Sequence, residues 1–259
     1  MIRFALLGSG SRGNATLIEG GRTRLLVDCG FSLRETEQRL ARLGVSPESL
    51  SAVLVTHEHG DHLRGVLPLA RRYRLAVWMT PGTGYACRLR REDEVRPIRL
   101  DEPFTVGDLR ITPFAVPHDA REPCQFRVDD GDLALGLLTD AGCLTPHVRK
   151  MLDGCHGLVL ECNHDPGMLA AGPYPPALKR RVGGDYGHLS NGQAASLLTD
   201  IATGRLQCLV GAHLSEKNNR PELAARALAG ALGCRAEEIE VAAQDVPSRW
   251  FAMRRAGLA

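Results

Sequence analysis

The sequence predicts an α/β (α+β) protein in which two mixed β-sheets pack face to face with helices outside. Two observations predict this fold. Short apolar runs rich in Val, Ile and Leu, bounded by Gly, Pro or Asp, alternate with helical patterns almost from end to end. The N-terminal part is strand-rich and meander-like, whereas the later part alternates strand and helix, which favours mixed sheets covered by helices.

Eleven apolar runs are expected to form strands. They span 2–7, 15–19, 23–28, 52–56, 76–80, 109–116, 124–129, 133–139, 157–162, 207–212 and 239–244. Four helices are expected, after Ser32, over 62–73, after Ser190 and over 221–232. The first and third begin with the capping-box pairs Ser32–Glu35 and Ser190–Gln193, in which each side chain bonds the other residue's amide.

The composition is that of an ordinary globular chain. Of the 259 residues, 44% are hydrophobic and 24% charged, which excludes disordered, collagen-like and coiled-coil proteins. The net charge of +2 is too mild to imply nucleic-acid binding and does not exclude it. No apolar run is long enough to span a bilayer or to form a signal-peptide core. The eight cysteines form no C-x-x-C pair, so we expect reduced, buried thiols in a cytoplasmic protein.

A cluster of histidines follows the apolar run 51–56. Its sequence is His57-Glu58-His59-Gly60-Asp61-His62. Alternate residues of an extended segment share a side, so His57 and His59 can face one metal ion, while Asp61 and His62 face a second. Imidazole and carboxylate ligands suit Zn²⁺, Mn²⁺ or Fe. The alternative is a His-rich surface loop, and Glu58 is interpreted as a carboxylate that points away from the metals.

The H-x-H-x-D-H motif after a buried strand resembles the metallo-β-lactamase superfamily. That resemblance implies a four-layer αβ/βα sandwich (the metallo-β-lactamase fold) with a two-metal site at the sheet edges. It also implies three further ligands, each at a strand end. His118, Asp140 and His213 stand in that context and in that order. His59 occupies a position at which the redox di-iron branch usually has Glu, so the motif favours hydrolysis.

By resemblance, seven residues hold two divalent ions, Mn²⁺ and/or Zn²⁺. The first ion would have His57, His59 and His118, the second Asp61, His62 and His213, and Asp140 would bridge both. Paired cations lower the pKa of a water held between them, so a bridging hydroxide can act as nucleophile, and Asp61 is counted among the catalytic residues too. Because these ligands must converge, we expect one domain over residues 1–259.

Further segments narrow the resemblance to the WalJ/YycJ group. They are 8–14, 26–30, 161–165, 187–191 and 213–219. This group is similar to RNase Z and to PhnP-type cyclic phosphodiesterases, and the resemblance implies 5′→3′ exonuclease action on DNA in repair or genome maintenance. It also implies that Glu161 orients His188 and that His188 protonates the leaving oxygen, a task suited to a group that titrates near neutral pH. The alternative for His188 is an ordinary loop histidine.

Eight residues are candidate substrate or supporting contacts. They are Asp28, Ser11, Asn14, Asn163, His164, Lys179, Arg180 and Arg181. By resemblance, Asp28 fixes a ligand histidine. The Gly-rich loop 8–14 either cradles phosphate or forms a tight turn, and His164 either lines the site or bonds Asp165. The basic run 179–181 either contacts a nucleic-acid backbone or is a solvated face.

The sequence therefore predicts a two-metal phosphodiesterase with DNA as its substrate and no membrane partner. A small-molecule hydrolase, acting on a cyclic phosphate, a thioester or a lactone, is the alternative enzyme. A non-catalytic scaffold is disfavoured because all seven ligands are present. The oligomeric state stays open, a dimer included.

Overall fold

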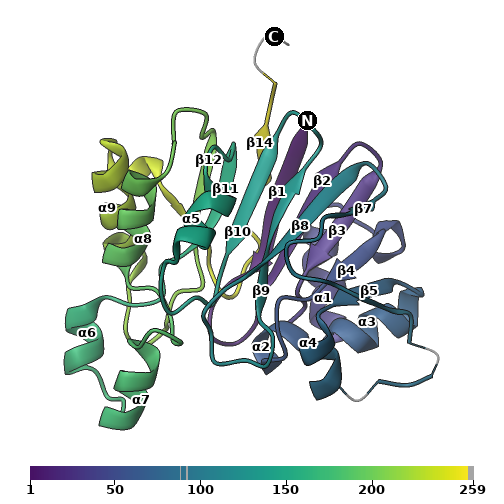
Figure 1. The fold of residues 1–259 in the computed structure, drawn as a ribbon, viewed down its shortest axis with the longest axis horizontal. Coiled ribbons are helices and arrows are strands. Elements are labelled where there is room, and N and C mark those ends of the chain that lie inside the picture. Colours follow the sequence, from purple (N-terminus) through teal and green to yellow (C-terminus); the bar gives the residue numbers. More distant parts are fainter. Residues whose placement is uncertain (88, 92, 256–259) are drawn as a thin grey trace. The chain divides into compact units, whose positions relative to one another are not determined.

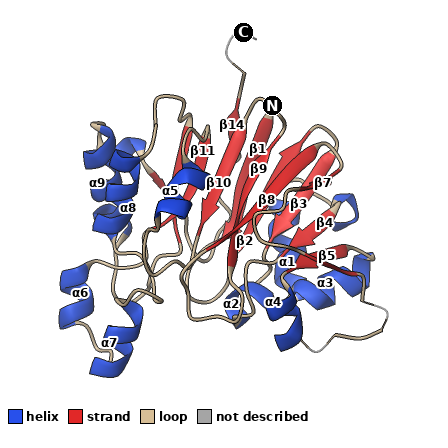
Figure 2. Cartoon of the chain, in the orientation of Figure 1, coloured by secondary structure: helices blue, strands red, loops and turns tan. Residues whose placement is uncertain are grey.

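The chain, described here by a computed structural model over residues 1–87, 89–91 and 93–255, contains two seven-stranded β-sheets accompanied by helices (Figures 1 and 2). The strand orders are β14-β1-β2-β3-β4-β5-β6 and β13-β12-β11-β10-β9-β8-β7. Both sheets contain parallel and antiparallel pairs, so the predicted α/β class with two mixed sheets is confirmed.

The chain divides into two compact units. The first comprises Met1–Ala115, Ala120–Ala134 and the segment from Ala243, and the second Val116–Asp119 and Leu135–Ala242. Whether they act as the single domain predicted above stays a prediction, and each unit is described by itself.

The first sheet begins as an antiparallel meander and continues with parallel strands. The meander is β1 (Ile2–Gly8), β2 (Ala15–Gly20) and β3 (Thr23–Val27), with β14 (Phe251–Met253) antiparallel to β1. The parallel strands are β4 (Ala52–Leu54), β5 (Ala76–Met79) and β6 (Val95–Pro97). Since β3 and β4 run in parallel, the residues that follow them, Asp28 and Thr56, emerge at the same sheet edge.

The second sheet has the same mixture. Its antiparallel strands are β7 (Phe104–Val106), β8 (Leu109–Ala115) and β9 (Cys124–Asp129). Its parallel strands are β10 (Ala134–Leu138), β11 (Gly157–Glu161), β12 (Cys208–Ala212) and β13 (Glu240–Val241). Because β10, β11 and β12 are parallel, Asp140, Glu161 and His213 come from the carboxyl ends of neighbouring strands.

Nine α-helices and two 3₁₀ turns connect the strands among the described residues. In the first unit they are α1 (Leu33–Arg42), α2 (Gly60–Leu63), α3 (Val66–Tyr73), α4 (Pro81–Ala86) and the turn Pro47–Ser49. In the second they are α5 (Pro146–Leu152), α6 (Pro166–Ala171), α7 (Pro176–Val182), α8 (Asn191–Asp200), α9 (Pro221–Leu232) and the turn Ala236–Glu238. Within the described part of the chain, none of the helices combines the length and the apolar character needed to cross a bilayer.

Both predicted capping boxes are present, at Ser32 and Ser190. The prediction of a single helix over 62–73 is wrong, because the segment forms the end of α2 and all of α3, with a break at Gly65. The Gly65 amide donates to the Cys29 carbonyl at 2.7 Å. A Cβ at Gly65 would lie 2.1 Å from the Phe31 carbonyl oxygen, so the backbone approaches too closely for any other residue.

The first unit has a core between its sheet and its helices. Leu40 of α1 and Leu69 of α3 pack with Leu17, Leu26 and Val53 of the sheet, and all five are fully buried. Strands of the second sheet lie against the first within this unit, since Trp78 of β5 stacks on Phe104 of β7 at a centroid distance of 4.2 Å. In the second unit, Leu197 of α8 and Leu228 of α9 are fully buried, and the two helices lie side by side (Figure 1).

Three strands of the structure were not predicted from the sequence, and one predicted strand was too long. The short strands β6, β7 and β14 each have three residues, and all three lie at sheet edges, where burial leaves little periodic signal. The strand expected over 239–244 contains only the two residues of β13. The other expected strands are present with ends that differ by at most two residues.

Candidate metal and catalytic site

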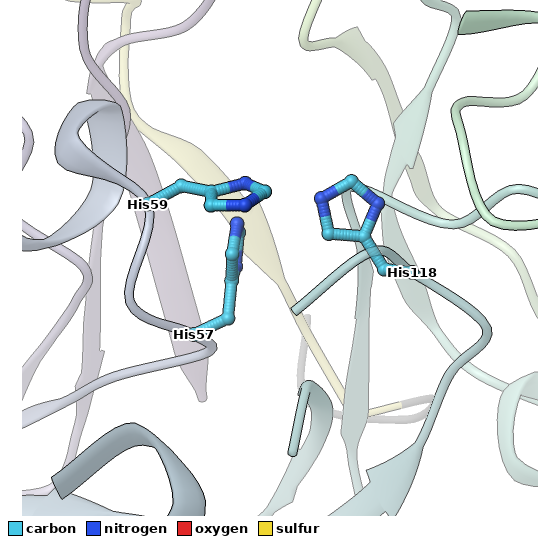
Figure 3. Close-up of side chains that lie close together, drawn as sticks. All are labelled: His57, His59 and His118. Atoms are coloured by element: carbon cyan, nitrogen blue, oxygen red, sulfur yellow. The ribbon is translucent and has the colours of Figure 1, made fainter. Parts of the chain in front are cut away.

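The histidine motif occupies the loop between β4 and α2. His57 and His62 are buried and His59 is partly exposed. The His57 ring lies 4.5 Å from that of His59, edge to face, and 4.4 Å from that of His62. Figure 3 shows the rings of His57 and His59 turned toward each other from the same loop. The motif therefore gathers its three imidazoles at one point of the first unit.

Asp28 supports two of these histidines. Its Oδ2 lies 2.8 Å from His62 Nδ1 and accepts a 2.8 Å hydrogen bond from the Thr56 hydroxyl. Asp28 Oδ1 accepts the Thr56 amide, and the Thr56 hydroxyl lies 2.9 Å from His57 Nδ1. Because both Nδ1 atoms are engaged, Nε2 is the ring nitrogen of His57 and His62 that can bind a metal. The Nε2 of His62 also lies 3.2 Å from Asn14 Nδ2. Sequence reasoning missed Thr56, although it is the polar residue between the buried strand and the first histidine.

Asn14 ties the Gly-rich loop to the motif. Its Nδ2 donates to Asp61 Oδ2 at 3.3 Å, and its amide donates to the Asp61 carbonyl at 2.8 Å. Its Oδ1 accepts from the Gly10 amide and the Ser9 hydroxyl. The amides of residues 10, 12, 13 and 14 all donate within the unit, so the loop folds as a tight turn that positions Asp61. Ser11 is exposed at its tip.

Glu58 does not join the other motif residues. Its Oε1 accepts the Arg121 amide at 2.8 Å, so it ties the motif loop to the loop before β9.

The ligand candidates of the second unit stand at strand ends. Asp140 is 2% and His213 3% exposed, and both have left-handed backbones, with φ of 53° and 55°. Such φ values are costly for residues with a side chain and tend to mark functional sites. The Asn163 side chain donates to the His213 carbonyl at 3.0 Å and so supports that conformation.

Three imidazole nitrogens surround Asp140 Oδ1. His188 Nδ1 is 3.4 Å away, His213 Nε2 3.6 Å and His118 Nε2 3.7 Å. All three distances exceed those of a normal hydrogen bond. Donor atoms held about 2.1 Å from one tetrahedral ion are about 3.4 Å apart, so the distances of His213 Nε2 and His118 Nε2 from Asp140 Oδ1 are close to those between ligands of a divalent cation. The His62 Nε2 to Asp61 Oδ2 distance of 3.4 Å in the first unit fits in the same way.

His118 is oriented by the loop between α7 and α8, through the residue that precedes His188. Its Nδ1 lies 3.0 Å from the Gly187 carbonyl oxygen, and its Nε2 faces two carboxylates, with Asp119 Oδ1 at 3.5 Å and Asp140 Oδ1 at 3.7 Å. Burial lowers the pKa of His118, so the neutral imidazole, the form that binds metals, is favoured. Figure 3 shows its ring on the loop that follows β8.

Glu161 supports two histidines from the end of β11. Its Oε1 lies 2.9 Å from His188 Nδ1 and 3.0 Å from His213 Nδ1, and its Oε2 accepts the Ala141 and Leu189 amides. Burial would raise the pKa of Glu161, but His188 and the two imidazole hydrogen bonds outweigh burial and hold this pKa at about 2. Burial would lower the pKa of His188, but Glu161 outweighs it, so the pKa of His188 is raised.

Four residues of the second unit can share a metal ion by their spacing. They are Asp140, Glu161, His188 and His213, whose ligand atoms all lie within 4.8 Å of one another. Since Glu161 already binds both imidazoles, we interpret it as the group that orients ligands rather than as a ligand.

The remaining candidates separate into two groups. His164 is buried and lines a cavity together with Lys179 and Arg180. Arg181 points elsewhere, because it forms an ion pair with Asp119.

Comparison with known proteins identifies the family. The model of the beta-lactamase superfamily domain matches residues 23–209. The chain belongs to this superfamily. It is 36% identical over 231 residues to exodeoxyribonuclease YycJ of Bacillus anthracis, and 35% over 228 residues to exodeoxyribonuclease WalJ of Streptococcus pneumoniae. These matches cover 86% of this chain and 86% and 85% of the relatives. The predicted resemblance is confirmed, and the chain is a metal-dependent hydrolase.

Solved structures show the same fold. The metallo-beta-lactamase fold protein YhfI from Bacillus subtilis has a TM-score of 0.74 at 17% identity, with 95% of this chain and 98% of YhfI covered. The short form of human tRNase Z has a TM-score of 0.66 at 15% identity, with the same coverage. At such low identity these likenesses concern the fold alone.

Proposed function

We propose that this metallohydrolase is an exonuclease that hydrolyses phosphodiester bonds of DNA. The observation that carries the proposal is the 36% and 35% identity to two exodeoxyribonucleases along 86% of this chain. The Glu161–His188 pair supports it, because cleavage of a phosphodiester requires a proton for the leaving oxygen.

The proposed metal ligands are the seven residues predicted from the sequence. They are His57, His59, Asp61, His62, His118, Asp140 and His213. Their nitrogen and carboxylate donors suit Zn²⁺ or Mn²⁺. Two such ions would supply an activated water at neutral pH and neutralise the charge that develops on the phosphate. This proposal includes the single domain, because the ligands come from both units.

Glu161 and His188 are positioned for the proposed proton transfer to the leaving oxygen. Glu161 engages His188 Nδ1, so His188 Nε2 is the atom that gives its proton to the leaving oxygen. The raised pKa of His188 keeps more of its protonated form near neutral pH. Asp28 and Thr56 orient His62 and His57 through their Nδ1 atoms.

The finer features of the function belong to the same proposal. They are 5′→3′ polarity, a role in DNA repair or genome maintenance, support by Mn²⁺, and a place in the cytoplasm. The cysteines support the last, since none of the eight, all of which lie in the described residues, is part of a disulfide, and Cys29, Cys124, Cys155 and Cys162 are buried.

A digestion assay tests the proposed function. Metal-loaded protein is incubated with duplex and single-stranded DNA and RNA, each labelled at the 5′ or the 3′ end. We expect DNA to be shortened from its 5′ end, releasing the 5′ label in the smallest products from the start. If the protein cuts none of these substrates and hydrolyses a nucleoside cyclic phosphate, the nuclease proposal is wrong.

RNA is the second candidate substrate. The chain is 35% identical over 112 residues to ribonuclease Z of Methanopyrus kandleri, a match that covers 39% of each chain. The RNA arms of the same assay decide this candidate, since an RNA nuclease would cut RNA faster than DNA of the same sequence.

A further inference from the structure

A cavity of about 400 Å³ opens in the second unit beside the end of β11, and the proposed chemistry does not use it. Its wall combines the turn between β11 and α6, helices α6 and α7, and the first turn of α8. This volume lies in the range of small-ligand sites and exceeds what a lone phosphate needs.

The charged side chains of the wall are both cationic. Lys179 and Arg180 line the cavity, and no carboxylate does so among the described residues. Lys179 Nζ donates to the Ala170 carbonyl at 2.5 Å, which leaves two of its three N–H bonds for a ligand. Arg180 has no acidic partner in the described part of the chain, whereas its neighbour Arg181 is paired with Asp119. The wall therefore selects an anion.

His164 adds a polar group that the protein itself leaves unsatisfied. The residue is 4% exposed, and its buried Nδ1 has no hydrogen-bond partner among the described residues. Its Nε2 would lie 4.0 Å from a Cβ at Gly183, which also lines the cavity. A buried nitrogen without a hydrogen bond costs free energy, and the imidazole that carries it lines the cavity.

The start of α8 and one apolar wall complete the cavity. Ser190 caps this ten-residue helix and lines the cavity together with Gln193, so the positive end of the helix dipole adds to the two cations. Leu169 and Ala170 of α6 form an apolar part of the wall. A ligand with both an anionic group and an apolar face fits this combination, as a nucleotide does.

The cavity shares its loops with the catalytic pair. His164 lies three residues after Glu161, and Ser190 two residues after His188. We infer that the cavity binds a phosphate-bearing nucleotide of the substrate strand next to the cleaved bond, with Lys179 and Arg180 on its phosphate. This inference rests on the proposed function.

The test compares two double variants of the metal-loaded full chain. Lys179→Gln/Arg180→Gln removes both cations of the cavity. The control, Lys150→Gln/Arg226→Gln, removes one lysine and one arginine that are exposed in the same unit and do not line the cavity. Each is assayed on a single-stranded oligonucleotide and on bis(p-nitrophenyl) phosphate, a diester without neighbouring nucleotides.

We expect the cavity variant to raise the oligonucleotide KM about tenfold or more, with kcat and the small-diester rate unchanged. The slope of log KM against log salt should fall by about 0.7 per cation removed. The control should match wild type in both. A cavity variant with wild-type KM and salt slope on an oligonucleotide that wild type cuts would overturn the inference while leaving the proposed function intact.

Two further measurements are needed. One distinguishes a terminal from an internal phosphate of the strand, and the other tests the cavity independently of the proposed nuclease function. The first measurement compares the KM of oligonucleotides that carry a 5′-phosphate with the KM of those that carry a 5′-hydroxyl. If the cavity variant no longer distinguishes the two, the cavity binds the terminal phosphate. If the substitution raises both KM values equally, the cavity binds an internal phosphate. If wild type cuts no oligonucleotide, the proposed function fails, and binding of deoxyadenosine 5′-monophosphate decides the cavity. Affinity about tenfold weaker in the cavity variant than in the control supports it, and equal affinity overturns it.

Discussion

At the scale of residues, one buried carboxylate in each unit fixes two histidines. Asp28 contacts His62 directly and His57 through Thr56, and Glu161 contacts His188 and His213. Both carboxylates are nearly inaccessible, Asp28 at 3% and Glu161 at 0% exposure. Each carboxylate therefore sets which ring nitrogen remains for chemistry.

Removal of Asp28 should weaken metal binding without removing a ligand. We expect Asp28→Asn to lower metal affinity about 10–100-fold, because the amide supports His62 less well than a carboxylate does. Titration of metal-free protein with Zn²⁺ against a competing chelator measures this. Asp200→Asn, at a surface ion pair with Arg149, should leave the affinity unchanged. Equal affinities of Asp28→Asn and wild type would refute the supporting role.

Removal of His188 should affect turnover rather than metal content. We expect His188→Ala to reduce kcat on DNA about 10²–10⁴-fold, the usual contribution of a general acid. Elemental analysis of the purified variant should give the metal content of wild type. Loss of metal would show instead that His188 is a ligand or holds the site together.

The lowered pKa of Glu161 predicts how stability depends on pH. Because its pKa is about 2 in the fold and about 4.3 in an unfolded chain, its contribution is complete above pH 4.3 and is lost as the pH falls toward 2. Urea unfolding of metal-free protein should therefore show a smaller loss of stability over this interval in Glu161→Gln than in wild type. The exposed Glu237→Gln should follow wild type. A Glu161→Gln curve parallel to that of wild type would contradict the assignment.

At the scale of elements, the sequence predicted what local patterns encode. The capping pairs at Ser32 and Ser190 were recognisable because both partners lie within four residues. The break between α2 and α3 was not, because it depends on the approach of Gly65 to Phe31, which only the folded chain brings about. Thr56 was missed for the same reason, since the register of β3 on β4 places it beside Asp28.

Gly65→Ala tests that close approach. The added Cβ would meet backbone, so we expect a loss of about 2 kcal/mol or more in the free energy of unfolding. Gly230→Ala in α9 is the control, since its Cβ would meet no atom within 4 Å, and alanine should stabilise the helix by about 0.5–1 kcal/mol. Thermal unfolding measures both. Equal melting temperatures for the two variants would contradict the packing described for Gly65.

At the scale of the whole molecule, the fold and the family were predictable from one sequence. Each candidate ligand follows a predicted strand or lies in the H-x-H-x-D-H motif, but it was the resemblance to the superfamily that singled these residues out as predicted ligands. The cavity beside β11 was not predictable, because α6 and α7, which form much of its wall, were not expected as helices. The roles within the basic run 179–181 could not be predicted either. Only the structure shows that Lys179 and Arg180 line the cavity whereas Arg181 forms an ion pair with Asp119.

The most direct test of the two-metal site measures bound metal and DNA cleavage in the same sample. Metal-free wild type is titrated with Mn²⁺, and the ions bound per chain are counted as the rate of DNA digestion is recorded. We expect two ions per chain, with activity that appears as the second ion binds, and loss of at least one ion and of activity in Asp140→Ala. Full activity with a single ion, or unchanged binding of two ions by Asp140→Ala, would contradict the two-metal phosphodiesterase.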